Sequence, residues 1–374
     1  MRFDLHAILI AVPFLLVNSS PSSPVRAQGS AASAARMPPI RQSVDAVVNK
    51  WMAREGAPGS IVVVRMGGDT QFFAYGMANQ ARHLPVTPDS IFELASLTKL
   101  FTATSLALEV NAGRMRLDDS VAKYIPQLAK GGDIRRVTLG ELATHSSGLP
   151  RKAPSLRTGA WNEGEVLQWL IHWHAPHPPG TRYLYSNLGF QTLGQAIAVH
   201  ENAPILDIWG RQLLDKLGMH HTLLDIPRDA SSLVVQGYSI SGQPIALNPV
   251  SGWPGAGALR SSGRDMGAFL AANMDGRADL PELTRAFRFA QQTHFEQHGL
   301  AWERRTIGGQ IILDKNGGLP STSTYIGFLP DRKIGVVIMT NRGKRHATTV
   351  GRALLMELSS HHSYRGHDED EEGD

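Results

Sequence analysis

The chain has 374 residues, of which 42% are hydrophobic and 19% charged, and its formal net charge is +4. A chain of this length and composition can bury one large core or two cooperating subdomains. It contains no cysteine, which excludes disulfides, lipid attachment through a thiol and thiol catalysis. No repeat with a period of about 20–50 residues stands out, which argues against a solenoid.

The N-terminus carries the pattern of an export signal. An apolar run over 7–17 follows Arg2 and precedes a Ser/Pro-rich segment that ends in Val25-Arg26-Ala27. The run has the length of a signal-peptide core and is short for a membrane span. We therefore expect a signal peptide over 1–27, a linker over 28–39, a periplasmic or secreted bacterial protein, and no stable membrane span after removal of the signal. An uncleaved anchor is the alternative.

Charge is distributed unevenly along the chain. Residues 368–374 hold six acidic side chains, so the rest of the chain is more basic than the net charge suggests. We expect 362–374 to be an acidic, disordered tail. A basic body favours anionic partners such as cell-wall polymers. No block of Lys and Arg with interleaved aromatic residues is present, so no nucleic-acid partner is expected.

The predicted elements place strands at both ends of the chain and helices between them. A helix over 40–54 is followed by a hairpin of 61–64 and 71–75, and helical signals dominate from 96 to 276. This pattern predicts an α+β fold: one antiparallel sheet built from both chain ends, flanked by helices, with an inserted helical subdomain over about 100–276. The remaining predicted elements are strands over 300–303, 310–315, 324–329 and 334–340, and a helix over 347–358.

Ser96 and Lys99 form an S-x-x-K pair at the start of a predicted helix. Residues three apart lie on one helix face, so the hydroxyl and the ammonium can point into the same cleft. A serine must lose its proton as it attacks, and a lysine with a lowered pKa can help take that proton. The pair indicates a nucleophilic serine, although S-x-x-K also occurs by chance in many helices.

Two further elements follow in chain order. Tyr185-Ser186-Asn187 comes after a turn-forming Pro178-Pro179-Gly180, and an extended segment would point its phenol and amide the same way. Lys315-Asn316-Gly317-Gly318 ends an apolar run over 311–313 that is typical of a strand. Its lysine adds positive charge, and its glycines let a substrate backbone pair with the strand edge. Taken singly, a core tyrosine and a hairpin turn are the alternatives; the ordered set of three indicates a site.

The order S-x-x-K, Y-x-N, K-x-G resembles the penicillin-recognising serine enzymes. The tyrosine in the middle element is similar to the branch that contains class C β-lactamases, low-molecular-weight DD-peptidases and some esterases. The resemblance implies a β-lactamase/transpeptidase-like serine hydrolase domain over 40–361, with the three elements meeting where the helical subdomain faces the sheet. Further similar stretches lie at 142–150, 257–266, 325–331 and 334–338.

The resemblance also implies acyl transfer through a covalent intermediate. Ser96 would attack a carbonyl while Lys99 and Tyr185 take its proton, and which of the two is the formal base stays open. The backbone N–H groups of Ser96 and Gly318 would hold the oxyanion, while Asn187 would bind the substrate's amide and Lys315 its carboxylate. The predicted substrate-binding residues are Asn187, Lys315, Asn316, Gly317 and Gly318.

Substrate class is predicted from differences within the family. Asn316 stands where the family usually has Thr or Ser, whose hydroxyl helps bind the substrate's carboxylate, so carboxylate recognition should differ here. Residues 185–190 and Leu149-Pro150-Arg151 are more similar to periplasmic DD-carboxypeptidase/endopeptidases than to dedicated β-lactamases. We therefore expect a cell-wall DD-carboxypeptidase/endopeptidase. In order, a class C-like β-lactamase, a carboxylesterase and a non-hydrolytic penicillin-binding protein are the alternatives.

No cofactor and no metal are predicted, and the expected partners are peptidoglycan peptides, β-lactams or both. His172, His174 and His177 are close in sequence but lack a second set of ligands at matching spacing, which favours a solvated loop. His145 lies in a Thr-His-Ser-Ser-Gly context that indicates a structural turn. The chain has no G-x-S-x-G elbow, no Walker loop and no G-x-G-x-x-G after a strand.

Overall fold

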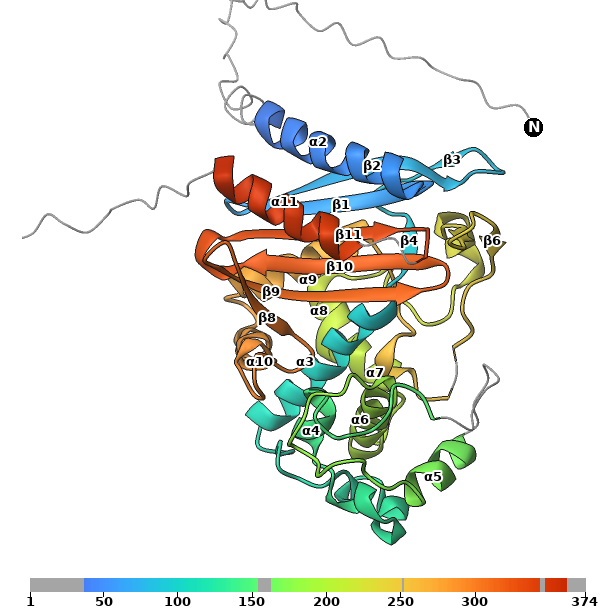
Figure 1. The fold of residues 1–374 in the computed structure, drawn as a ribbon, viewed down its shortest axis with the longest axis vertical. Coiled ribbons are helices and arrows are strands. Elements are labelled where there is room, and N and C mark those ends of the chain that lie inside the picture. The colour runs from blue at the N-terminus through green and yellow to red at the C-terminus, as the bar shows by residue number, and fades with distance from the viewer. Residues whose placement is uncertain (1–36, 154–162, 251, 344–346, 362–374) are drawn as a thin grey trace, which may run out of the picture. The chain divides into compact units, whose positions relative to one another are not determined.

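Residues rich in β-branched side chains form a seven-stranded antiparallel sheet with the order β3-β2-β1-β11-β10-β9-β8 (Figure 1). The computed structural model describes residues 37–153, 163–250, 252–343 and 347–361, so the predicted signal peptide and acidic tail lie outside the described residues. The strands are β1 (Gly59–Met66), β2 (Asp69–Asn79), β3 (Leu84–Pro85), β8 (Glu303–Ile307), β9 (Gln310–Leu319), β10 (Thr322–Leu329) and β11 (Ile334–Thr340).

The two ends of the chain meet in the middle of this sheet. β1 pairs with β11 in a register that runs from Ser60 opposite Thr340 to Met66 opposite Ile334. Successive side chains of β1 point to opposite faces, and both faces are covered, so the run 61–64 is apolar throughout and almost fully buried. The predicted fold class is confirmed.

Each face of the sheet has its own core. Helices α2 (Met37–Glu55) and α11 (Ala347–His361) cover one face, where Val44 and Leu354 pack with Val62. The other face packs against α9 (Gly263–Asp275), and Figure 1 shows α11 and α9 on opposite sides of the strands. Residues 37–39, expected in the linker, already belong to α2, because proline is tolerated in the first turn of a helix.

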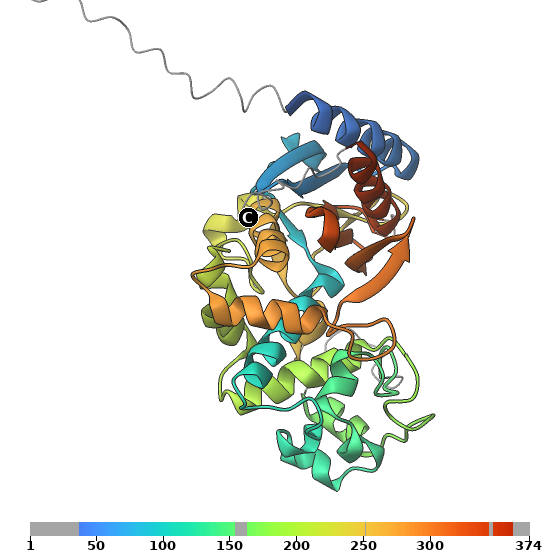
Figure 2. The same ribbon diagram turned by 90° about the vertical axis from the view of Figure 1, so that its left-hand side faces the viewer.

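Residues between the two parts of the sheet form the expected helical subdomain, which includes two small pairs of strands. In Figure 2 its cyan-to-green helices gather at the end away from α2 and α11. Among the described residues, no helix is both long and apolar enough to cross a membrane. The elements are β4 (Ile91–Glu93), α3 (Thr98–Asn111), α4 (Leu139–Ala143), α5 (Glu163–Ile171), α6 (Asn187–His200), α7 (Ile205–Trp209), α8 (Asp215–Leu217), β5 (Gly237–Tyr238), β6 (Pro244–Ile245), β7 (Arg260–Ser262), α9 and, after it, α10 (Pro281–Gln291).

One strand is displaced from its predicted position. The strand expected over 300–303 begins only at Glu303, so that prediction was wrong. Leu300 donates its N–H to Ala290 O at the end of α10, and Ala301 has a φ of 63°, which no regular strand contains. Leu300 and Trp302 are apolar because they are buried in the core, where Trp302 meets Phe328 edge to face, and not because they lie in a strand.

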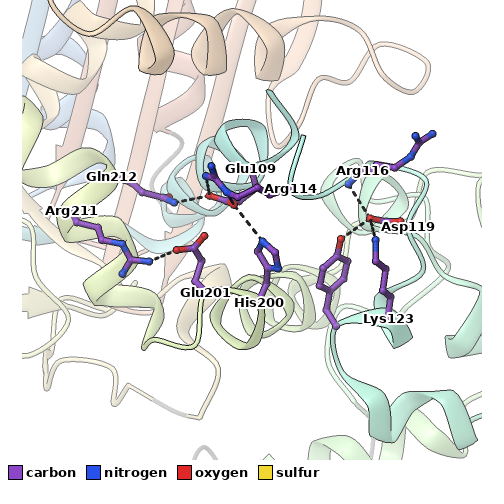
Figure 3. Close-up of polar contacts among 10 residues, drawn as sticks. Glu109, Arg114, Arg116, Asp119, Lys123, His200, Glu201, Arg211 and Gln212 are labelled. Atoms are coloured by element: carbon purple, nitrogen blue, oxygen red, sulfur yellow. Dashed lines mark hydrogen bonds and ion pairs between the residues drawn. The ribbon is translucent and has the colours of Figure 1, made fainter. Parts of the chain in front are cut away.

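A buried carboxylate joins three elements of the helical subdomain (Figure 3). Glu109 of α3 is fully buried, and it accepts hydrogen bonds from Arg114 Nε at 2.7 Å, Arg114 Nη2 at 2.8 Å and Gln212 Nε2 at 2.9 Å. His200 Nε2 lies 3.5 Å from the same carboxylate. Glu109, His200 and Glu201 could offer three ligand atoms within 4.8 Å, but both Glu109 oxygens already accept hydrogen bonds, and Glu201 pairs with Arg211. The cluster is an ion-pair network.

We predict that Arg114→Ala lowers the free energy of unfolding by about 3 kcal/mol at neutral pH, because it leaves the Glu109 carboxylate buried without its cation. Burial raises the pKa of Glu109, but its hydrogen bonds, that from Arg114 first, bring this pKa below the ordinary value. The contribution should therefore be lost as the pH falls through that pKa. Urea unfolding measures both effects.

The matched control is Arg116→Ala. Arg116 pairs with Asp118, and both side chains are 71% exposed, so its removal should cause no measurable change. Equal effects of the two substitutions would contradict the assignment of Glu109 as a structural ion pair.

Candidate active site

Ser96 lies on a short turn between β4 and α3. Ala95, Ser96 and Leu97 form a single 3-10 turn that leads directly into α3, so the serine precedes the helix N-terminus as predicted. Ala95 has a φ of 51°, a strained conformation for a residue with a Cβ, and such strain is often found at functional sites. The turn holds Ser96 half-buried with its side chain in the cleft.

The three sequence elements meet at Ser96. Its Oγ lies 2.6 Å from the hydroxyl of Tyr185 and 3.0 Å from Lys99 Nζ. These are hydrogen-bond distances for a nucleophile and its proton acceptors. The structure thus brings the predicted nucleophile together with both groups expected to take its proton.

Lys99 is fully buried. Besides Ser96, its ammonium donates to Asn187 Oδ1 at 2.8 Å and to the carbonyl of Ala256 at 2.6 Å. Burial, with a smaller contribution from the charge of Arg151, holds the pKa of Lys99 well below 10.5. Burial disfavours the charged form, so this amine loses its proton more readily than an ordinary lysine.

The middle element is extended only as far as Ser186. Ser186 caps α6 by accepting the N–H of Gly189 at 2.8 Å, and Asn187 is the first helical residue, not a strand residue as expected. The prediction that Tyr185 and Asn187 point the same way from an extended segment was wrong in this respect. Both side chains still contact the Ser96–Lys99 pair, because the cap turns the chain sharply between them.

Lys315 lies on β9, behind Tyr185. Its side chain is fully buried, its Nζ lies 3.7 Å from Glu303 Oε1 on β8, and the Tyr185 ring centre is 5.2 Å away. Burial lowers the pKa of Lys315, while Tyr185 and Glu303 oppose this effect. The structure thus places the Lys315 amine beside Tyr185, with the Glu303 carboxylate next to it.

Residues 315–319 of β9 run past the end of β8. The β8–β9 pairing stops at Glu303 opposite Asp314, whereas β9 stays paired with β10 up to Leu319. Beyond Asp314, the side of β9 that faced β8 therefore pairs with no strand of the described part of the chain. A Cβ on Gly317 would lie 3.0 Å from Ser96 N and 2.6 Å from Leu94 O, so only glycine allows the strand this close to Ser96. A Cβ on Gly318 would meet nothing within 4 Å.

Two cavities meet at Ser96. The first has a volume of about 350 Å³ and contains Tyr185, Asn316 and Gly318 in its lining. The second, of about 290 Å³, shares Ser96 and Gly318 with the first and also includes Asn187. Every predicted site residue except the buried Lys99 and Lys315 lines at least one of them.

His145 orders the segment that carries Tyr185. Its Nδ1 accepts the N–H of Ser186 at 3.1 Å, its carbonyl accepts the N–H of Leu184 at 2.7 Å, and its ring lies 4.3 Å from the Tyr185 ring. Burial, followed by the charges of Lys315 and Lys99, holds the pKa of His145 well below 6.5. The sequence prediction of a structural turn agrees with these contacts, and the φ of 61° is one that histidine adopts more often than most residues.

The sequence analysis did not predict two residues that lie near the site. Arg151 lines both cavities, and Glu303 lines the first. Arg151 follows directly after a stretch that resembles the family, so its position next to Leu149-Pro150 was the available signal. The sequence offered no signal for Glu303, because its approach to Lys315 depends on the pairing of β8 with β9. His174 of the histidine-rich loop is 85% exposed and lies 3.6 Å from Asp133.

Comparison with known proteins identifies the family. Residues 44–359 match the family model described as Beta-lactamase, and the chain belongs to this family. The β-lactamase of Lysobacter lactamgenus is 27% identical over 82% of this chain and 89% of its own, and that of Providencia stuartii is 31% identical over 81% and 87%. Members of the Beta-lactamase family are hydrolases that act through a serine acyl-enzyme, so this protein is a serine hydrolase.

Solved structures agree with this assignment. A class C β-lactamase superposes with a TM-score of 0.80 at 26% identity, covering 86% of this chain and 96% of that one. The structure described as a D-alanine carboxypeptidase AmpC from Burkholderia cenocepacia superposes with a TM-score of 0.78 over 86% and 99% of the two chains. At 24% identity this second likeness establishes a shared fold.

We predict that Ser96→Ala abolishes covalent labelling by a fluorescent penicillin while leaving the thermal unfolding curve nearly unchanged. The half-buried hydroxyl is expected to act in chemistry, and its loss leaves no large cavity. Gel fluorescence and calorimetry measure the two outcomes. Labelling that persists in the variant would show that another residue is the nucleophile.

We also predict a pH-dependent signature for His145. Because its pKa is lowered in the folded state, the unfolded chain binds the extra proton first, and stability falls as the pH drops below about 6.5. In His145→Asn, the amide oxygen can accept the Ser186 N–H without titrating. From pH 7.5 to 5.5 the wild type should lose up to ~1.4 kcal/mol per pH unit relative to this variant.

Urea unfolding at the two pH values tests this. His172→Asn removes an exposed imidazole and serves as the control. Parallel pH dependence of wild type and His145→Asn would rule out a buried neutral histidine at this position.

Proposed function

We propose that this serine hydrolase is a cell-wall DD-carboxypeptidase/endopeptidase that cleaves peptides ending in D-alanine. The observation that carries the proposal is the unpaired edge of β9 at 315–319, which runs beside Ser96 between two cavities. An extended peptide can pair with such an edge and place chain on both sides of the scissile bond. Export through the N-terminal signal would bring the enzyme to this substrate in the periplasm.

In the proposed reaction, Ser96 Oγ attacks the carbonyl carbon of the scissile amide and gives its proton to the Lys99–Tyr185 pair. The negative charge that develops on the carbonyl oxygen is held by the backbone N–H groups of Ser96 and Gly318. Donors of this kind are worth about 3 kcal/mol each in the transition state. Gly317, which lets β9 approach to within contact of Ser96 N, supports this assignment.

The C–N bond then breaks, and the pair returns the proton to the departing amine. Tyr185 lines only the first cavity, so the leaving group belongs there and the acyl part of the substrate in the second. Asn187, at the second cavity and bonded to Lys99, is placed to hold the acyl part's amide. Water finally hydrolyses the Ser96 ester, with the same pair taking the proton of the water.

β-Lactam hydrolysis is the second candidate, favoured by the curated relatives, which are named β-lactamases. The two functions share the acylation step and differ in the lifetime of the acyl-enzyme. In a peptidase the penicilloyl ester persists, whereas a β-lactamase clears it quickly.

We predict that the penicillin acyl-enzyme persists for minutes or longer and that muropeptide pentapeptides release D-alanine. A time course of fluorescent-penicillin labelling, D-alanine release and nitrocefin turnover measures all three on one preparation. Ser96→Ala is the control for each signal. Rapid β-lactam turnover without D-alanine release would favour the β-lactamase instead, and hydrolysis of p-nitrophenyl esters alone would favour an esterase.

A further inference from the structure

Arg151 is attached to the catalytic element through its backbone. It lies in the segment after α4, where the carbonyl of Pro150 accepts the Ser186 hydroxyl at 2.8 Å. The carbonyl of Arg151 itself accepts the N–H of Asn187 at 3.3 Å. These hydrogen bonds hold the backbone of Arg151 at the N-terminus of α6, next to Tyr185 and Asn187.

The Arg151 guanidinium lies at the junction of the two cavities. It lines both of them, and its central carbon is 5.2 Å from the centre of the Tyr185 ring. The side chain is exposed, and within the described part of the chain it has neither an ion pair nor a hydrogen bond to a side chain. Its planar set of N–H donors is therefore available to a ligand.

Of the other cations described near the site, Lys99 and Lys315 are fully buried, and Lys152 lines only the second cavity. Lys99 donates to three oxygens inside the protein, and Lys315 is buried with Glu303 at 3.7 Å. The second cavity also contains an anion, the Glu93 carboxylate, which accepts hydrogen bonds from Asn248 and Ser321. Among the described residues that line the first cavity, Arg151 is the only cation.

Asn316 lies in the same cavity. Its side chain is exposed, and its amide can donate two hydrogen bonds. The first cavity is where the proposed reaction places the leaving group, because Tyr185 of the proton-transferring pair lines only this cavity. A C-terminal amino acid carries a carboxylate one carbon from that nitrogen, and a guanidinium binds a carboxylate with two parallel N–H bonds.

We propose that Arg151, assisted by Asn316, binds the C-terminal carboxylate of the leaving amino acid and so directs the enzyme to the last residue of a peptide. This inference rests on the proposed peptidase function and narrows it from cleavage within cross-linked chains to removal of the terminal D-alanine. Cleavage within a chain presents an amide at that position, which has no charge for Arg151 to bind.

The test compares two peptides with the same leaving nitrogen: diacetyl-L-Lys-D-Ala-D-Ala and its C-terminal amide. For wild type we expect faster cleavage of the acid. Arg151→Gln should lower kcat/KM for the acid about 30-fold, which corresponds to about 2 kcal/mol at 1.36 kcal/mol per factor of ten, chiefly through KM. The amide should lose much less, because only the smaller effect of the Arg151 charge on the pKa of Lys99 applies to it, and Arg151→Lys should restore part of the preference for the acid.

Lys152→Gln is the matched control, since Lys152 is the exposed neighbour of Arg151 and lines only the second cavity. It should leave the acid-to-amide ratio unchanged. An equal loss on both peptides in Arg151→Gln, or no loss on the acid, overturns the carboxylate assignment even if D-alanine is released.

A second substrate pair separates this inference from the proposed function. Acylation by benzylpenicillin is compared with acylation by its methyl ester, which lacks the charge. If wild type releases no D-alanine but still prefers benzylpenicillin in an Arg151-dependent way, the peptidase proposal fails and the carboxylate site stands. Absence of the preference in both pairs overturns the site.

Discussion

The ammonium of Lys99 is the group on which the site depends. It lies in a fully buried position, and the described residues place no carboxylate within ion-pair distance of it. Three oxygens hold it instead, from the turn before α3, from the first residue of α6 and from the Pro254–Ala256 turn. A buried charge without such partners would be very costly, so the chemistry of Ser96 and the packing of three separate segments are coupled through one nitrogen atom.

That coupling requires very close packing around the lysine. A Cβ on Gly255 would lie 2.6 Å from the carbonyl of Phe190 and 3.1 Å from the Cα of Gly194, so the turn and α6 touch through bare backbone. The carbonyl of Ala256 reaches Lys99 only because of this approach. Gly317 allows a similarly close approach between β9 and the turn that carries Ser96.

β9 connects the cleft to the far side of the sheet. Asp314 and Lys315 are neighbours, so they point to opposite faces. Asp314 is buried and bonded to Arg352 of α11 at 2.6 Å and to the Tyr325 hydroxyl at 3.1 Å, which anchors the strand. Burial raises the pKa of Asp314, and the bond to Arg352 opposes this. An ion pair outside the cleft thus helps to keep Lys315 and the free edge of β9 in place.

Local patterns in the sequence determined the fold class, five of the seven strands of the large sheet, the helices near both chain ends, and the residues that meet at Ser96. The apolar run of β1, the S-x-x-K spacing and the apolar run before Lys315 each involve a few residues, so they can be recognised without knowledge of the rest of the fold. Tertiary structure decided the rest. The turn at Ala301, which moved a predicted strand to Glu303, depends on contacts with α10 and α4. The approach of Arg151 to both cavities depends on hydrogen bonds to α6, because a side chain's surroundings come from segments far away in the chain.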